Sequence, residues 1–125
     1  MTSLILVMLG GALGSGARYA TGRATLSLFG SSYPFGTLAV NLIGGLLMGL
    51  LAGILARHQG SEPWRLFLGV GVLGGFTTFS AFTLDVVTLA ERGLPVAALG
   101  YVLLSVAGAI AALVAGLYLA RSMAA

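Results

Sequence analysis

The chain has 125 residues, of which 58% are hydrophobic and 7% charged, so it cannot supply the polar shell that a soluble domain of this size needs. Its net charge of +3 comes from six Arg against three acidic residues, and these Arg lie near the ends of apolar runs rather than in the basic stripe of a nucleic-acid-binding protein. The absence of Cys excludes disulfides, thiolate metal sites and Cys nucleophiles.

Four stretches are apolar enough to cross a bilayer, which takes about 20 mostly apolar residues. They run over residues 4–28, 34–56, 64–90 and 95–120, with polar joints at 30–32, 57–63 and 91–93. No Lys or Arg precedes the first apolar run, so we interpret it as a retained span rather than a cleaved signal peptide. Because little chain is left over, we expect residues 1–125 to form one all-α, four-helix transmembrane domain.

Small residues recur every four positions inside these spans. The repeats are Gly10 with Gly14, Gly45 with Gly49 and Gly53, Gly71 with Gly75, and Gly108 with Ala112 and Gly116. In lipid, helices associate by close van der Waals contact, and small residues at this spacing let two backbones approach. For most of these positions we expect a packing role only.

The second span carries one amide side chain at membrane depth, that of Asn41. Polar groups within a membrane are rare and tend to be functional, and the NH₂ of Asn41 offers two donors. The alternative is an interhelical hydrogen bond worth about 0.6 kcal/mol. The local sequence favours neither interpretation over the other.

The third span contains a poor helix interior, in which Gly74-Gly75 is closely followed by Thr77-Thr78. Each Gly costs about 1 kcal/mol relative to Ala in a helix interior. Irregular backbone at membrane depth survives only where it is buried in protein or lines a polar cavity, and freed carbonyls there can bind a cation. We therefore predict a helix broken in mid-span, with a simple kink filled by neighbouring side chains as the alternative.

An aromatic stripe follows this point, with Phe76, Phe79 and Phe82 recurring every three residues among hydroxyl side chains. Such a stripe is usually packing. However, an aromatic ring has a positive edge, so a ring presented edge-on can favour a small anion beside hydroxyl and amide donors.

Four helices are too few to enclose a pore alone, which points to an oligomer. With four spans, Arg57, Arg65 and Arg121 fall on one side, and Arg18, Arg23 and Arg92 fall on the other. This three-against-three balance gives the positive-inside rule nothing to act on, so the protein could insert both ways and pair antiparallel with itself. The alternative is that other insertion signals fix one orientation.

Three segments together resemble the signature blocks of the Fluc-type fluoride channels, the CrcB family. They are Gly11–Tyr19 (GALGSGARY), Gly36–Asn41 (GTLAVN) and Gly74–Phe82 (GGFTTFSAF), in the family's order and spacing across essentially the whole chain. The resemblance implies a non-enzymatic channel of the prokaryotic inner (cell) membrane that exports fluoride passively and relieves fluoride toxicity. It also implies an antiparallel, dual-topology homodimer with two pores.

The resemblance assigns roles to ten residues. Asn41 matches the pore donor to fluoride, and Phe79 and Phe82 match the rings whose edges face the ion. Gly74 and Thr77 match positions whose backbone carbonyls, from both subunits, hold one central structural Na⁺. The others are Tyr101 and Ser105 as a polar track, Ser80 and Thr37 as pore-side hydroxyls, and Arg18 as a vestibule residue or one that reaches the membrane interface.

Two positions depart from the family pattern, and both affect the expected pore. Ala109 stands where the polar track usually has another hydroxyl, and Asp85 stands near a place where the family often has Glu. The main rival function is a small multidrug antiporter, which needs a membrane-embedded acid that the first span lacks. A scaffold peptide would have no use for Asn41, and His58 has no catalytic partner that would favour an enzyme.

Overall fold

The computed structural model describes residues 1–124, and every regular element among them is helical. The elements are α1 (Thr2–Phe29), α2 (Phe35–Leu55), α3 (Glu62–Trp64), the π-helix η1 (Arg65–Leu73), α4 (Gly74–Phe76), α5 (Ser80–Glu91) and α6 (Pro95–Ala124). Helices α1, α2 and α6 are each long and apolar enough to cross a membrane, and so is the composite segment Glu62–Glu91. The predicted four-span, all-α membrane architecture is confirmed, with boundaries within a few residues of those expected.

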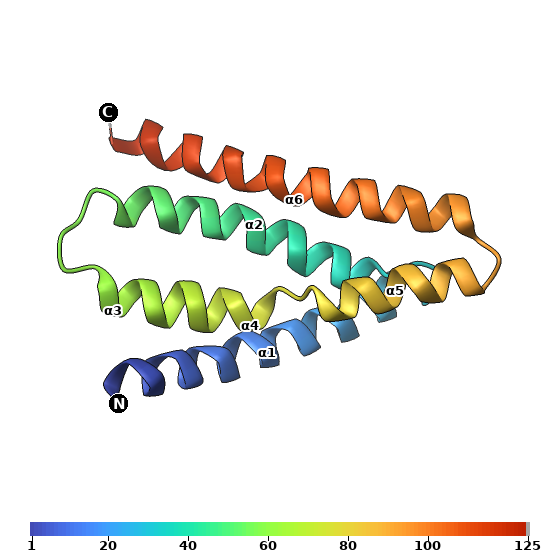
Figure 1. Cartoon of the computed structure of the whole chain (residues 1–125), viewed down its shortest axis with the longest axis horizontal. Coiled ribbons are helices and arrows are strands. Elements are labelled where there is room, and N and C mark those ends of the chain that lie inside the picture. The colour runs from blue at the N-terminus through green and yellow to red at the C-terminus, as the bar shows by residue number, and fades with distance from the viewer. Residues whose placement is uncertain (125) are drawn as a thin grey trace.

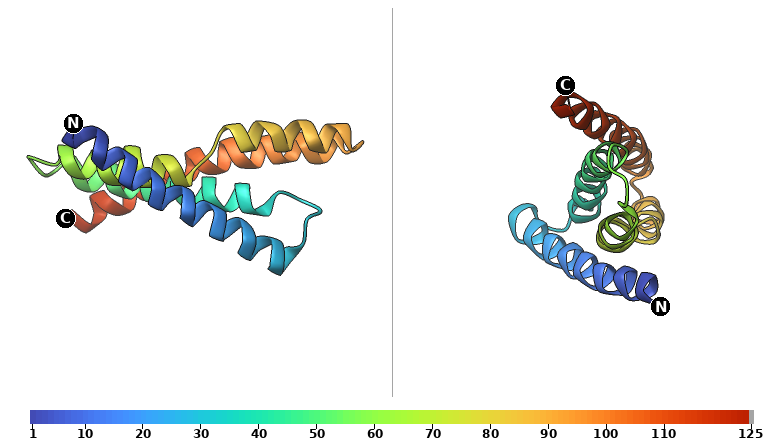
Figure 2. Two further views of the ribbon diagram at one scale, coloured as in Figure 1. Left: turned by 90° about the horizontal axis from the view of Figure 1, so that it is seen from below. Right: turned by 90° about the vertical axis from the view of Figure 1, so that its left-hand side faces the viewer.

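The spans run back and forth, so that the two termini and the α2–α3 connection share one end of the molecule (Figure 1). The α1–α2 and α5–α6 connections lie at the other end. Helix α6 packs on α2, and α1 packs on η1 and α4. The second half of the third span, α5, leaves the line of the first half and runs with α6, so the helices splay apart at the end away from the termini (Figure 2).

Close backbone contact holds the spans together, as the small-residue repeats predict. A Cβ on Gly71 would lie 2.9 Å from the Cα of Gly10, and a Cβ on Gly45 would lie 2.8 Å from the carbonyl oxygen of Ala109. A Cβ on Gly116 would meet the backbone nitrogen of Leu50 at 2.8 Å. These separations leave no room for side chains, so the packing role of the repeats is confirmed between α1 and the third span and between α2 and α6.

The third span is helical up to Phe76 and again from Ser80, with three residues between that are not helical. Thr77 is extended, with φ −84° and ψ 160°. Its hydroxyl bonds back to the carbonyl of Leu73 at 2.9 Å, and the hydroxyl of Thr78 accepts from the amide of Ala81 at 3.1 Å. The two Thr thus supply local hydrogen bonds that a continuous helix would take from its backbone, which stabilises the interruption.

Most large apolar side chains face outward, as expected for a protein solvated by lipid. The main buried cluster lies towards the splayed end and joins α2, α5 and α6. Its members are Leu38, Phe82, Leu89, Ala98 and Tyr101. This cluster fixes α5 against α6 after the interruption and so sets the walls of the cavities described next.

Candidate functional site

A groove of about 420 Å³ lies beside the interruption, between α2 and α6. It brings together five of the residues that the sequence predicted for the site: Asn41, Thr77, Phe79, Phe82 and Ser105. Ala109, the departure from the expected polar track, also lines it. No ionisable side chain is among the described residues that line this groove.

Asn41 forms two hydrogen bonds with the backbone of a single residue of the interruption. Its Nδ2 donates to the carbonyl of Thr78 at 3.0 Å, and its Oδ1 accepts from the amide of Thr78 at 2.8 Å. The amide group of Asn carries two N–H donors, so one remains for a ligand in the groove. The interhelical hydrogen bond that was one of the two interpretations of Asn41 is therefore present, and its role as a donor to an ion stays a prediction.

The two Phe rings meet at a centroid distance of 5.6 Å with planes inclined by 47°. Phe79 is 76% exposed, whereas Phe82 is 7% exposed and belongs to the buried cluster. Phe82 also contacts the ring of Tyr101, at a centroid distance of 5.3 Å. The two rings therefore differ: Phe79 lies at the open side of the groove, and Phe82 lines the groove and also packs in the core.

The two residues of the expected polar track on α6, Tyr101 and Ser105, also lie in different surroundings. Ser105 is buried and lines the groove, and its Oγ has no hydrogen-bond partner among the residues that the structure describes. Tyr101 is fully buried and lies outside the groove lining, and its hydroxyl donates to Oδ2 of Asp85 at 3.0 Å. This partner of Asp85 could not be predicted from the sequence, because nothing in the local pattern of α5 indicates which face of α6 it meets.

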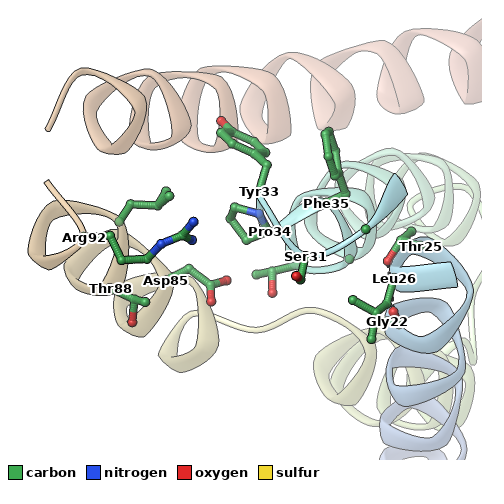
Figure 3. A pocket seen from close by; sticks show the side chains of 14 residues that line it. Gly22, Thr25, Leu26, Ser31, Tyr33, Pro34, Phe35, Asp85, Thr88 and Arg92 are labelled. Carbon is green, nitrogen blue, oxygen red and sulfur yellow. Dashed lines mark hydrogen bonds between the residues drawn. The ribbon is translucent and has the colours of Figure 1, made fainter. Parts of the chain in front are cut away.

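A polar pocket of about 320 Å³ opens at the splayed end, between the start of α2, the α1–α2 connection and α5. The guanidinium group of Arg92 and the carboxylate of Asp85 both point into it (Figure 3). Thr88, Ser31 and Thr37 add hydroxyl groups to its wall. The pocket therefore places polar groups between this end of the molecule and the Asp85–Tyr101 pair.

A second polar pocket, of about 420 Å³, continues from the first to the interruption. Both pockets are lined by Gly22, Leu26, Gly36 and Thr37. The second also contains Arg18, Arg23 and Thr78. The Nε of Arg18 donates to the carbonyl of Gly75, at 3.1 Å, close to the middle of the third span.

Several predicted site residues thus lie outside the groove. Thr37 and Arg18 line the polar pockets, and Tyr101 is in the core. Ser80 is exposed, with its Oγ 3.4 Å from the hydroxyl of Thr78. Gly74 is exposed at the end of the first half of the third span.

The carbonyls of Gly74 and Thr77, which the sequence predicted as cation ligands, have lost their helical hydrogen bonds. In a continuous helix these two carbonyls would accept from the amides of Thr78 and Ala81. Those amides instead donate to Asn41 Oδ1 and Thr78 Oγ1. Within residues 1–124, no backbone amide donates to either carbonyl, which leaves both oxygens for a ligand.

Comparison with known proteins places this architecture in a family. A family model described as CrcB-like protein, Camphor Resistance (CrcB), matches residues 5–117. Proteins named fluoride-specific ion channel FluC from Mesorhizobium japonicum, Caulobacter sp. and Chelativorans sp. are 54%, 55% and 56% identical to the chain. The alignments cover 97–98% of this chain and 96–99% of those proteins. This multi-pass membrane protein therefore belongs to the CrcB family.

Proposed function

We propose that the protein is a fluoride-selective channel of the bacterial cell membrane that conducts fluoride passively and has no enzymatic activity. The observation that carries this proposal is the groove beside the interrupted helix, where neutral donors and aromatic rings meet without an ionisable side chain. The names of the relatives, fluoride-specific ion channel, support the same function.

Fluoride is small and strongly hydrated, so a narrow pore must replace its water donors with protein donors. Asn41 has an N–H to spare, and the hydroxyl of Ser105 is buried without a partner. Phe79 and Phe82 line the same groove, and ring edges presented there would add positive quadrupole density. Neutral groups bind the anion weakly enough to release it, which conduction requires.

The access path on this proposal is the pair of polar pockets. Arg92 lies near the open end, where Asp85 offsets its charge, and Arg18 and Arg23 lie in the second pocket, where their positive charge attracts anions towards the interruption. Thr37 lines both pockets and so offers its hydroxyl where they join. On this proposal Arg18 is a vestibule residue that attracts the anion, and its Nε also donates a hydrogen bond to the carbonyl of Gly75.

The functional unit that we propose is an antiparallel homodimer with two pores. A single chain leaves the groove open and Phe79 76% exposed, and a second copy would close it. The unpaired carbonyls of Gly74 and Thr77, taken from both subunits, would hold one structural Na⁺ at the dimer axis. Such an ion would link the subunits and neutralise carbonyl dipoles at membrane depth.

Ion efflux from liposomes that contain the purified protein tests this function. We expect rapid fluoride release on collapse of the gradient, with chloride release near that of empty liposomes, because chloride is too large for the same donors. Equal release of both anions would contradict the proposal. Fluoride release only under a proton gradient would point to the rival antiporter, although α1 contains no Asp or Glu.

A further inference from the structure

We infer that Arg18 is a positioning residue of the third span, which acts with Asn41 to fix the course of the backbone through the interruption. This inference rests on the proposed function for its consequence, the presentation of carbonyls to a cation. Its structural part rests only on contacts within the chain. Two side chains from two other spans bind the carbonyls of Gly75 and Thr78.

Side chains replace part of the backbone hydrogen bonding at the interruption. Leu73 O still accepts from the amide of Thr77, as in a helix. After it, Gly75 O accepts from Arg18 and Thr78 O accepts from Asn41, and regular bonding resumes when Phe79 O accepts from the amide of Thr83. The carbonyls of Gly75 and Thr78 therefore turn towards α1 and α2, and those of Gly74, Phe76 and Thr77 have no hydrogen-bond donor among residues 1–124.

The position of Arg18 follows from the packing of α1 one helical turn earlier. At Gly14, a Cβ would lie 2.9 Å from the amide nitrogen of Phe76, so the two backbones touch there. At Gly75, a Cβ would lie 2.6 Å from the carbonyl oxygen of Gly11. Arg18 is four residues beyond Gly14 and on the same face of α1, which brings its side chain across to the end of α4.

The guanidinium group suits this role better than an ammonium group. The Nε–H of Arg projects sideways from the chain, so it can bond Gly75 O and leave the two terminal nitrogens without a role in this bond. A positive charge at the end of the first half of the span also matches the negative end of that helical segment. Lys would retain the charge without a donor midway along the side chain.

Hydrogen exchange of the intact protein in detergent, followed by mass spectrometry of peptides that span residues 74–82, tests the positioning role. Arg18→Gln removes both charge and guanidinium group. Arg23→Gln is the matched control, because Arg23 is on the same helix and lines the same pocket, and its recorded bond is with Tyr19 rather than the interruption. We expect exchange about tenfold faster in Arg18→Gln and unchanged in Arg23→Gln, since loss of one bond to a charged group is worth a tenfold change or more.

Arg18→Lys separates position from charge in the same measurement. We expect its exchange to stay close to that of Arg18→Gln, because the sideways donor is missing. Wild-type exchange in Arg18→Lys would mean that charge alone suffices and would overturn the inference. Wild-type exchange in Arg18→Gln would overturn it directly.

The thermal midpoint of the same variants, measured in Na⁺ and in N-methylglucamine at equal ionic strength, tests the consequence. We expect Na⁺ to raise the midpoint in the wild type and in Arg23→Gln, and to raise it much less in Arg18→Gln. An equal Na⁺-dependent rise in Arg18→Gln would overturn the link between Arg18 and the cation. No rise in the wild type would instead refute the proposed Na⁺ site, and the exchange data would still decide the positioning role.

Discussion

At the residue scale, the side chains around the groove differ in what they do for the fold itself. Phe82 and Tyr101 are buried and in contact, so substitutions there disturb the core as well as the groove. Phe79 is exposed, and Ser105 contributes no intramolecular hydrogen bond. The last two therefore offer the cleanest tests of the proposed pore.

Phe79→Ile keeps much of the apolar volume and removes the positive ring edge. Because Phe79 is 76% exposed in a single chain, we expect the fold to lose little stability and the fluoride flux per dimer to fall severely. Efflux and size-exclusion chromatography on the same sample measure both.

Phe82→Ile should lower the fluoride flux. It should also lower the free energy of unfolding, by about 1.5 kcal/mol or less if the core repacks. Near-normal fluoride flux in both variants would show that the two Phe residues only pack against their neighbours and do not serve the pore.

Ser105→Ala removes a buried hydroxyl whose Oγ has no partner within the chain. A buried polar group without a partner costs about 1–3 kcal/mol, so its loss should leave the unfolding free energy unchanged or raise it. If the hydroxyl serves fluoride, efflux should nevertheless fall. A variant that is less stable but conducts normally would show that Ser105 is a structural residue.

At the scale of elements, the paired helices are held by contacts that only Gly permits. Helix α2 meets α6 along Gly49, where a Cβ would lie 3.0 Å from the amide nitrogen of Leu117 and closer still to the carbonyl oxygen of Leu113. Helix α1 meets the third span along Gly10 and Gly14 in the same way. These contacts position the interruption between Arg18 and Asn41.

Gly49→Ala should therefore separate α2 from α6 and destabilise the protein by about 1–3 kcal/mol through overpacking. Gly16→Ala is the control, because Gly16 also lies within a helix but a Cβ there meets nothing within 4 Å. Gly16→Ala should stabilise the helix by up to about 1 kcal/mol. Unfolding in detergent measures both variants, and equal effects would argue against the close contact.

At the scale of the whole molecule, the distribution of charge bears on orientation. Arg57, Arg65 and Arg121 lie towards the end that carries the termini, and Arg92 belongs to the opposite end. Arg18 binds Gly75 near the middle of the third span and so adds little to either end. The bias is then three against two rather than three against three, which is still close to balance.

We therefore expect C-terminal tags on the unmodified protein to be found on both sides of the membrane. Two or three Lys added at one end should shift the population towards one orientation, because the positive-inside rule then has a difference to act on. Accessibility of the tags in intact cells and in inverted vesicles measures this. A tag found on one side only would refute dual topology and, with it, the antiparallel dimer that we propose.

The sequence by itself determined the four spans and the packing glycines, and it predicted an irregular backbone around Gly74 and Thr77. Span length, hydropathy and small-residue spacing are local properties, so they can be taken from the chain without a partner. Family membership was also evident from three ordered motifs. The spans, the repeats and each single motif are made of residues close together in sequence.

The tertiary structure alone decided which groups bind the interruption. Arg18 and Gly75 are 57 residues apart, and Asn41 and Thr78 are 37 apart. It also separated Tyr101 from Ser105, which are one turn apart on α6. Helix α5 shifts sideways after the interruption. Asp85 therefore accepts a hydrogen bond from the hydroxyl of Tyr101, and Ser105 faces the groove. That shift depends on the path of three non-helical residues, which hydrophobic periodicity does not encode.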